Sequence, residues 1–156
     1  MDQLKVIDEL YPIKPLIIPE LDNYQILVSY NGDVYTPFHK EIRKSGRPLN
    51  VRGRKLIPSI GKGYYKVVLM HNSKKKTISV HRLVAMAWLS NYCDELQINH
   101  KNGNKLDNDY RNLEMCTVQE NISHSIRTGL KPKLKRDKKG RFAGKVGDNN
   151  GTDKHL

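Results

Sequence analysis

The sequence contains little cysteine, no long apolar run and no recognisable secretion signal. Its two cysteines, Cys93 and Cys116, lie far apart and form no Cys-x-x-Cys pair. This excludes a four-cysteine zinc site within the chain and favours a reducing compartment. Without a long apolar run or a basic amphipathic helix, we expect no membrane binding. The first residues lack the charged and then apolar pattern of a signal peptide, so we expect a cytoplasmic protein (in the host cytoplasm if phage-encoded) that is not secreted.

Aromatic and acidic residues are also scarce. Aromatic residues make up 7% and hydrophobic residues 37% of the 156 residues, which predicts a modest core with flexible ends. Only 16 acidic residues stand against 28 Lys and Arg, which gives a formal net charge of +12. Such an excess favours a polyanionic partner, because basic side chains gain affinity by releasing counterions from nucleic acid.

The positive charge is concentrated on two sides of a nearly balanced segment. Residues 36–90 carry thirteen Lys or Arg and a single acidic residue, and residues 131–156 carry nine basic and three acidic residues. Residues 91–130 carry four basic and six acidic side chains. A centre of this kind between basic flanks suits cation binding in the middle and phosphate binding on either side.

The first two thirds of the chain predict mainly antiparallel strands. Three prolines in residues 1–21 exclude a long helix and indicate an extended or loosely attached arm. Residues 24–36 predict a hairpin around an Asn-Gly turn, and residues 64–80 predict a second hairpin. The basic segment 39–55 between them predicts a loop or irregular ribbon. A helix is expected over 81–89 from its apolar stripe.

The next part predicts a strand, a loop, a second strand and a helix. A short strand over 96–98 leads to Asn99 and His100, and the stretch that follows is so rich in Asn, Asp and Gly that it must be a loop. A second strand is expected over 113–116. The helix over 117–128 begins with a capping box, a Thr followed three residues later by a Glu, and ends before a glycine.

These residues resemble the HNH endonucleases, whose catalytic fold is the ββα-metal (His-Me) finger, and in particular the phage and intron-encoded homing endonucleases. The matching blocks are, in chain order, Val80–Ala85, Ile98–Lys105, Asn112–Glu114 and Gln119–Asn121. Residues 24–35 resemble the small DNA-binding module that often precedes the nuclease in this group. The resemblance covers roughly residues 22–130 and implies an α+β fold.

The resemblance also implies the site residues. The catalytic set is His100, Asn112 and Asn121, in which His100 is the general base and Asn112 bridges backbone groups of the loop. Asn99 and Asn121 are the implied metal ligands, and several relatives carry Asp at the first position. Because both amides are neutral, we expect weak metal binding until a phosphate joins the ion. Oxygen ligands favour Mg²⁺, with Mn²⁺ as a substitute, and no structural zinc is expected.

We therefore expect an N-terminal arm (1–21), a β-rich DNA-binding module (22–75), an HNH nuclease domain (76–130) and a basic, flexible, DNA-contacting tail (131–156). The expected function is metal-dependent hydrolysis of double-stranded DNA, with nicking by a monomer or double-strand cleavage by a dimer. Two alternatives stay open, a DNA-binding protein without activity on the same frame and a basic RNA-binding protein. The expected DNA contacts are Arg43, Lys44, Arg47, Arg52, Arg54, Lys55, Lys74, Lys75, Lys76, Arg82, Lys101 and Lys105.

Overall fold

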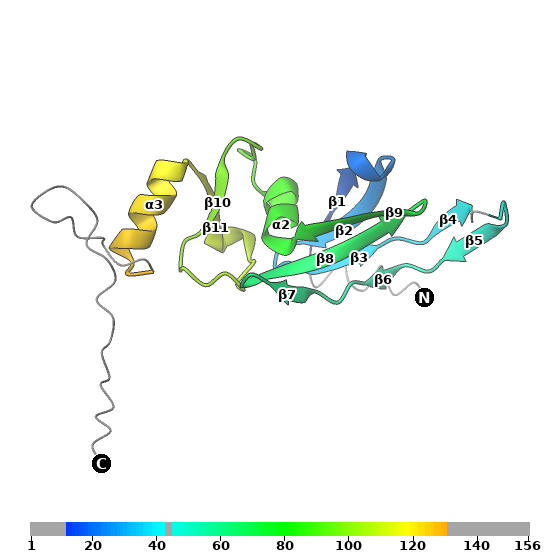
Figure 1. Cartoon of the computed structure of the whole chain (residues 1–156), viewed down its shortest axis with the longest axis horizontal. Helices are drawn as coiled ribbons and strands as arrows, with labels where there is room; N and C mark the ends of the chain where they lie inside the picture. Colours follow the sequence, from blue (N-terminus) through cyan, green and yellow to red (C-terminus); the bar gives the residue numbers. More distant parts are fainter. Residues whose placement is uncertain (1–11, 43–44, 131–156) are drawn as a thin grey trace, which may run out of the picture.

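The structure, a computed structural model, describes residues 12–42 and 45–130 (Figure 1). It has the expected α+β fold, in which every paired strand is antiparallel. The predicted tail over 131–156 and the first part of the predicted arm lie outside the described residues. The strands are β1 (Ile13–Ile18), β2 (Tyr24–Ser29), β3 (Val34–Thr36), β4 (His39–Ile42), β5 (Pro48–Val51), β6 (Arg54–Lys55), β7 (Ser59–Gly61), β8 (Tyr64–His71), β9 (Lys74–Ser79), β10 (Gln97–His100) and β11 (Leu113–Cys116). The helices are η1 (Pro19–Leu21), α2 (Val80–Trp88), η2 (Tyr110–Asn112) and α3 (Val118–Arg127).

The described part of the N-terminal arm is a strand of the first sheet. β1 pairs along its whole length with β2 in a sheet of order β1-β2-β3-β6. Ile18 and the following Leu21 are each only 1% exposed, so this segment contributes to the core. The expectation of an extended segment is correct here, whereas loose attachment is wrong. Prolines are accommodated because β1 is an edge strand, where a missing N–H breaks no ladder.

Two further sheets follow along the chain. β4 and β5 form a two-stranded ribbon, which is more regular than the predicted loop. The sheet β7-β8-β9 contains the second predicted hairpin, whose turn is Asn72-Ser73. Both turn residues have positive φ, as a tight two-residue hairpin requires. The predicted boundary between residues 75 and 76 falls inside β9, and the division into two domains stays a prediction.

Helix α2 lies at the centre of the molecule and packs against both halves (Figure 1). It begins one residue before the predicted start. Leu83, Val84 and Ala85 are fully buried and meet apolar side chains of β2 and β8. Trp88 ends the helix and donates its indole N–H to the carbonyl of Val28 at 3.1 Å. The helix therefore connects the N-terminal sheets with the segment that follows.

The turn between β2 and β3 is pressed against the loop that follows β10. The backbone N–H of Tyr110 donates to the carbonyl of Tyr30 at 2.9 Å. Gly32 has a φ of +99°, and a Cβ added there would lie 2.9 Å from the Cβ of Asn108. The glycine is required both for its left-handed conformation and for this close approach. No helix in the described residues is long and apolar enough to cross a membrane.

Candidate active site

The predicted strand–loop–strand–helix unit is present. β10 and β11 pair antiparallel, so that His100 lies opposite Leu113. Helix α3 then begins with a full capping box. The Thr117 hydroxyl accepts from the Glu120 N–H at 3.2 Å, and the Glu120 carboxylate accepts from the Thr117 N–H at 2.8 Å. These reciprocal bonds satisfy two orphan N–H groups and fix where the helix starts after β11.

Strand β10 and helix α3 border one cleft of about 460 Å³. Asn99 and His100 reach it from the end of β10, and Asn121 reaches it from the first turns of α3. Lys105, from the loop, and His124, one turn further along α3, also line the cleft. The fold therefore brings together the predicted general base and both predicted metal ligands.

His100 is well placed to act as a base. The residue is only 5% exposed, and burial lowers its pKa, while contact with the Asn108 side chain and the charge of Asp107 oppose this shift. His100 lines the cleft, whereas its Nε2 is buried and therefore shielded from water. A neutral imidazole can accept a proton from water through its other ring nitrogen, which makes Nδ1 the candidate basic atom.

The two predicted metal ligands are each oriented by a neighbouring side chain. The Asn99 amide donates its N–H to Glu114 at 2.8 Å, and the Asn121 amide donates to Gln97 at 2.7 Å. These bonds use the amide nitrogens, so the carbonyl oxygens are the atoms that could bind a cation. Two amide oxygens beside a buried histidine fit a hard divalent ion such as Mg²⁺.

Glu114 is a site residue whose importance sequence reasoning missed. It lies directly opposite Asn99 in the β10–β11 register, which brings a carboxylate next to the neutral ligand. An aspartate in place of Asn99 would face this carboxylate and be repelled by it, since the observed contact needs an amide donor. The sequence could indicate Glu114 only through the pairing of the two strands. A shift of one residue in that register would have placed a different side chain opposite Asn99.

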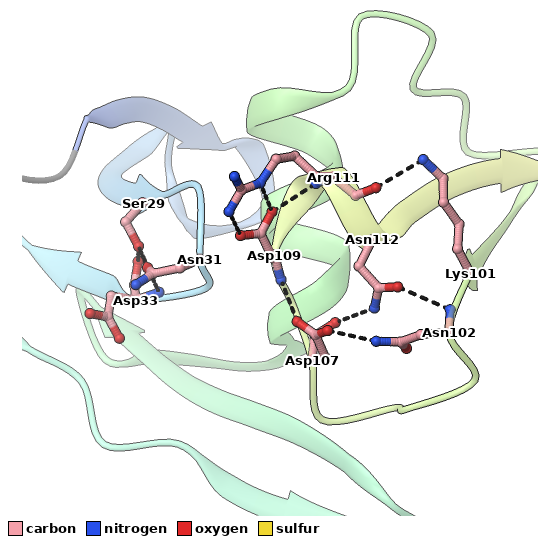
Figure 2. Close-up of polar contacts among 9 residues, drawn as sticks. All are labelled: Ser29, Asn31, Asp33, Lys101, Asn102, Asp107, Asp109, Arg111 and Asn112. Atoms are coloured by element: carbon pink, nitrogen blue, oxygen red, sulfur yellow. Dashed lines mark hydrogen bonds and ion pairs between the residues drawn. The ribbon is translucent and has the colours of Figure 1, made fainter.

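Asn112 makes the contacts expected of a loop-bridging residue (Figure 2). Its side-chain carbonyl accepts from the N–H of Asn102 at 3.0 Å, and its amide donates to the backbone carbonyl of Asp107 at 2.9 Å. Asn102 also donates to the Asp107 carboxylate at 2.7 Å. Together these bonds tie both ends of the loop to the start of β11. Asn112 therefore shapes the loop through these contacts.

A second histidine, His81, was not predicted as a site residue and packs against His100. The rings of His81 and His100 lie 5.3 Å apart edge to face, and Tyr64 lies 4.8 Å from His81. Burial, followed by the charges of His100 and Arg82, lowers the pKa of His81 to about 4. Its Nδ1 is buried and without a hydrogen bond among the described residues. His81 therefore remains neutral where an exposed histidine would be charged.

This burial predicts an acid-sensitive fold. The folded pKa of His81 lies below the ordinary value of 6.5, so the unfolded chain binds more protons as the pH falls from 6.5 towards 4. We expect His81 to cost up to about 2 kcal/mol of folding free energy between pH 7 and pH 5. Urea unfolding of wild type and His81→Gln at pH 7 and pH 5 measures this loss of folding free energy. An equal loss of stability in both proteins would contradict the prediction.

The predicted DNA-contacting residues fall into three groups, apart from Arg43 and Lys44, which lie outside the described residues. Four side chains already form ion pairs, namely Lys55 with Asp33, Lys74 with Asp22, Lys76 with Glu20 and Arg82 with Asp94. Four make no ion pair with any described residue, namely Arg47, Arg52, Arg54 and Lys75. Lys101 donates to the carbonyl of Arg111 at 2.9 Å, and the ammonium of Lys105 lies 5.0 Å from the centre of the Tyr64 ring. Of these ten residues, only Lys105 lines the cleft. Arg82 lies on α2, and Lys101 follows β10. The other seven belong to the strand-rich half.

Comparison with known proteins identifies the segment that holds this cleft. Residues 79–122, called the HNH segment below, match the family model described as HNH endonuclease. This segment belongs to the HNH endonuclease family. The HNH segment includes α2, both strands of the β10–β11 pair and the first turns of α3. HNH nucleases generally use a divalent metal, and the predicted ligands Asn99 and Asn121 both line the cleft.

Relatives match beyond the HNH segment as well. An uncharacterized HNH endonuclease of Acanthamoeba polyphaga mimivirus is 44% identical over 92 residues, which is 58% of this chain and 28% of that protein. The DNA endonuclease I-HmuI of Bacillus phage SP01 is 33% identical over 93 residues, 58% of this chain and 53% of that protein. A solved structure titled DNA binding and cleavage by the HNH homing endonuclease I-HmuI is similar with a TM-score of 0.56 at 32% identity. That similarity covers 72% of this chain and 59% of that chain. The chain thus spans about half or less of the curated relatives named here.

Proposed function

We propose that this protein is a metal-dependent DNA endonuclease that nicks double-stranded DNA. The observation that carries the proposal is the convergence of His100, Asn99 and Asn121 on one cleft within the HNH segment. General base and ligand oxygens come from two elements, β10 and α3, whose relative position is fixed by the capping box. The phage relative is likewise named a DNA endonuclease.

In the proposed reaction, His100 accepts a proton from the attacking water. Burial keeps its ring neutral and therefore able to accept, and packing against His81 holds its orientation. Asn99 and Asn121 would hold the divalent ion, which when bound neutralises developing charge on the phosphate as a Lewis acid. Glu114 and Gln97 hold the two amides in place by accepting their N–H groups.

Lys105 supplies positive charge at the edge of the same cleft. Its ammonium lies over the Tyr64 ring, a position from which it can contact a phosphate next to the scissile bond. We infer Mg²⁺ as the ion, with Mn²⁺ as a substitute, because the ligands are oxygen atoms. One cleft of this kind cuts one strand per binding event, so a monomer nicks, whereas paired chains would be needed to cut both strands.

A second candidate function is DNA binding without cleavage. The observation that favours it is the neutrality of both metal ligands, since Asn99 and Asn121 contribute no charge to hold the ion. The carboxylate of Glu114 compensates in part, because it lies 2.8 Å from the Asn99 amide and adds negative charge beside the ligand set. This carboxylate is the reason why we favour the active enzyme.

The experiment that separates these functions is conversion of supercoiled plasmid by the purified full chain with Mg²⁺ or with EDTA. Open circles that form only with Mg²⁺ would support a nicking enzyme. Linear product formed at the same rate as open circles would indicate paired sites. A plasmid that is bound but uncut with Mg²⁺ and with Mn²⁺ would overturn the endonuclease and support the binding protein. Stronger binding to duplex RNA than to duplex DNA would favour the RNA-binding alternative.

The pKa of His100 predicts the pH dependence of cleavage. A general base works in its neutral form, and burial lowers the pKa of His100 below its ordinary value of 6.5. We therefore expect the cleavage rate to stay high down to pH 6.5 and to fall only at lower pH. Single-turnover rates at saturating metal, measured between pH 5 and pH 8, test this. An acidic limb centred above pH 6.5 would argue against His100 as the base.

The two faces of β9 are expected to contribute differently to DNA binding. Successive side chains of a strand point to opposite faces, so exposed Lys75 projects away from Lys74 and Lys76. Lys74 is held by Asp22 at 2.5 Å, and Lys76 is paired with Glu20. We expect Lys75→Ala to weaken DNA binding several-fold and to reduce the slope of log affinity against log salt by about 0.9. The matched variant Lys74→Ala should change the slope less, and an equal change in both would contradict the prediction.

A further inference from the structure

Two histidines and one glutamate converge at the base of the β4–β5 ribbon. His39 and Glu41 are two residues apart on β4 and therefore share one face of the strand, and His71 is the last residue of β8. One ligand atom from each side chain can be chosen so that all three lie within 4.8 Å of one another. The ribbon lies at the opposite end of the molecule from α3 (Figure 1), so this cluster is separate from the HNH cleft.

The hydrogen bonds of His39 determine which of its ring nitrogens is protonated. Its Nδ1 lies 3.0 Å from the backbone carbonyl of Pro37, which can only accept, and this contact favours the tautomer with the hydrogen on Nδ1. In a neutral ring, Nε2 then has a lone pair, yet it lies 3.0 Å from the carboxylate of Glu41. Two lone pairs at this distance require a positive species between them, either a second proton on His39 or a cation.

His71 adds a third electron-pair donor to the same point. Its Nδ1 lies 3.4 Å from the same Glu41 oxygen, is buried, and makes no hydrogen bond among the described residues. A proton on His39 would satisfy the pair of His39 and Glu41 and leave His71 without a partner. A single cation between the three atoms would satisfy all of them, and burying a polar atom without a partner is costly.

The surroundings hold both rings in place. Tyr24 stacks on His71 with ring centres 4.4 Å apart and an angle of 12°, and its hydroxyl lies 3.3 Å from Nδ1 of His39. The side chains of His39, Glu41 and His71 are 14%, 19% and 14% exposed, so all three are largely shielded from solvent. Tyr24 itself is only 5% exposed, which ties the cluster to the main core. Such a framework restricts the side chains before any ion binds.

We propose that His39, Glu41 and His71 form a zinc site. Imidazole nitrogens with one carboxylate oxygen are ligands that Zn²⁺ favours, whereas Mg²⁺ and Ca²⁺ favour oxygen alone. Tetrahedral ligands at zinc bond lengths lie about 3.3 Å apart. The Glu41 oxygen lies 3.0 Å from Nε2 of His39 and 3.4 Å from Nδ1 of His71, and both distances match this spacing. With three protein ligands, the fourth position of the ion is open to water.

The ion fastens the ribbon to the rest of the molecule. β4 and β5 form a sheet of their own, with no ladder to β8, so the three side chains are a direct link between the ribbon and the β8–β9 hairpin. The ribbon and its flank carry Arg47 and Arg52, so the ion would hold these residues in place for DNA. The expectation of no structural zinc rested on cysteine spacing alone and did not consider histidine.

The test is titration of the chelator-treated full chain with Co²⁺, which reports a site of low coordination number by visible d–d absorption. Because the HNH cleft also offers metal ligands, the titration is made in the Asn121→Ala variant, which removes one of them, as well as in wild type. We expect both proteins to bind one Co²⁺ with this absorption, which an equivalent of Zn²⁺ displaces. Zn²⁺ should also raise the thermal unfolding midpoint by at least about 5 °C.

Two variants assign the signal to the cluster. His71→Ala removes one ligand, and Glu41→Gln keeps the side-chain shape while removing the charge. Both should lose the absorption and the zinc-dependent rise in midpoint, with circular dichroism showing that each is folded. If neither wild type nor Asn121→Ala shows the absorption, the proposed site is wrong, and no variant of the cluster is needed to decide this. The proposal is also overturned if the absorption survives in a folded His71→Ala protein or is lost in Asn121→Ala.

Discussion

Replacing His100 by alanine is expected to lower the rate of DNA cleavage by about 10²- to 10⁴-fold, the usual contribution of a general base. The reason is structural. His100 ends β10 and lines the cleft, and burial lowers its pKa, which favours the neutral ring. The measurement is single-turnover nicking of supercoiled plasmid at saturating protein and metal.

DNA affinity should change little in the same variant, because the phosphate-binding cations lie elsewhere. Gel-shift titration in EDTA measures affinity without cleavage. The matched control is His155→Ala, which removes the same side chain outside the HNH segment and should cleave like wild type. Cleavage by His100→Ala within threefold of wild type would exclude His100 as the base.

Replacing Asn121 by alanine is expected to reduce cleavage by about 10²-fold and to raise the metal concentration needed for half-maximal rate. Asn121 reaches the cleft from α3, while Asn99 reaches it from β10, so the variant removes one of two ligands that come from different elements. Because neither ligand is charged, the remaining one should hold the ion weakly. Rates measured across a range of Mg²⁺ concentrations give both quantities.

Gln97→Ala provides the graded control for Asn121. Gln97 accepts the Asn121 amide N–H at 2.7 Å and has no assigned ligand role, so its loss should misorient the ligand without removing it. We expect a loss of cleavage smaller than that of Asn121→Ala, with a smaller shift in the metal curve. A metal curve for Asn121→Ala that matches wild type would show that Asn121 is not a ligand.

Local patterns were enough to predict most elements. The Asn-Gly turn of the first hairpin, the strand over 113–116 and the capping box at Thr117 are determined by residues close in sequence, and the structure contains all three. For the N-terminal arm, the prolines left an extended and a loosely attached segment both open, and the described part is extended and paired. β2 is the partner strand, which a local pattern does not reveal.

The candidate site was predictable only in part, for the same reason. His100, Asn99 and Asn121 followed from resemblance to a known motif, and the structure places them on one cleft, although their roles stay predictions. Glu114 and His81 were missed. Each acts through a contact between elements, namely the β10–β11 register for Glu114 and the packing of α2 on β10 for His81.

By itself, the sequence predicted a polyanionic partner and determined the α+β composition and the HNH segment, because charge, periodicity and motif spacing are properties of neighbouring residues. The tertiary structure decided which of the described cationic side chains are free of ion pairs and which polar side chains contact one another. Lys74 is paired because Asp22 lies across from it, whereas Lys75 projects to the other face, and His39 meets His71 because β4 reaches the end of β8. Such contacts depend on how sheets pack, and the chain must bury a shared core before any of them exists.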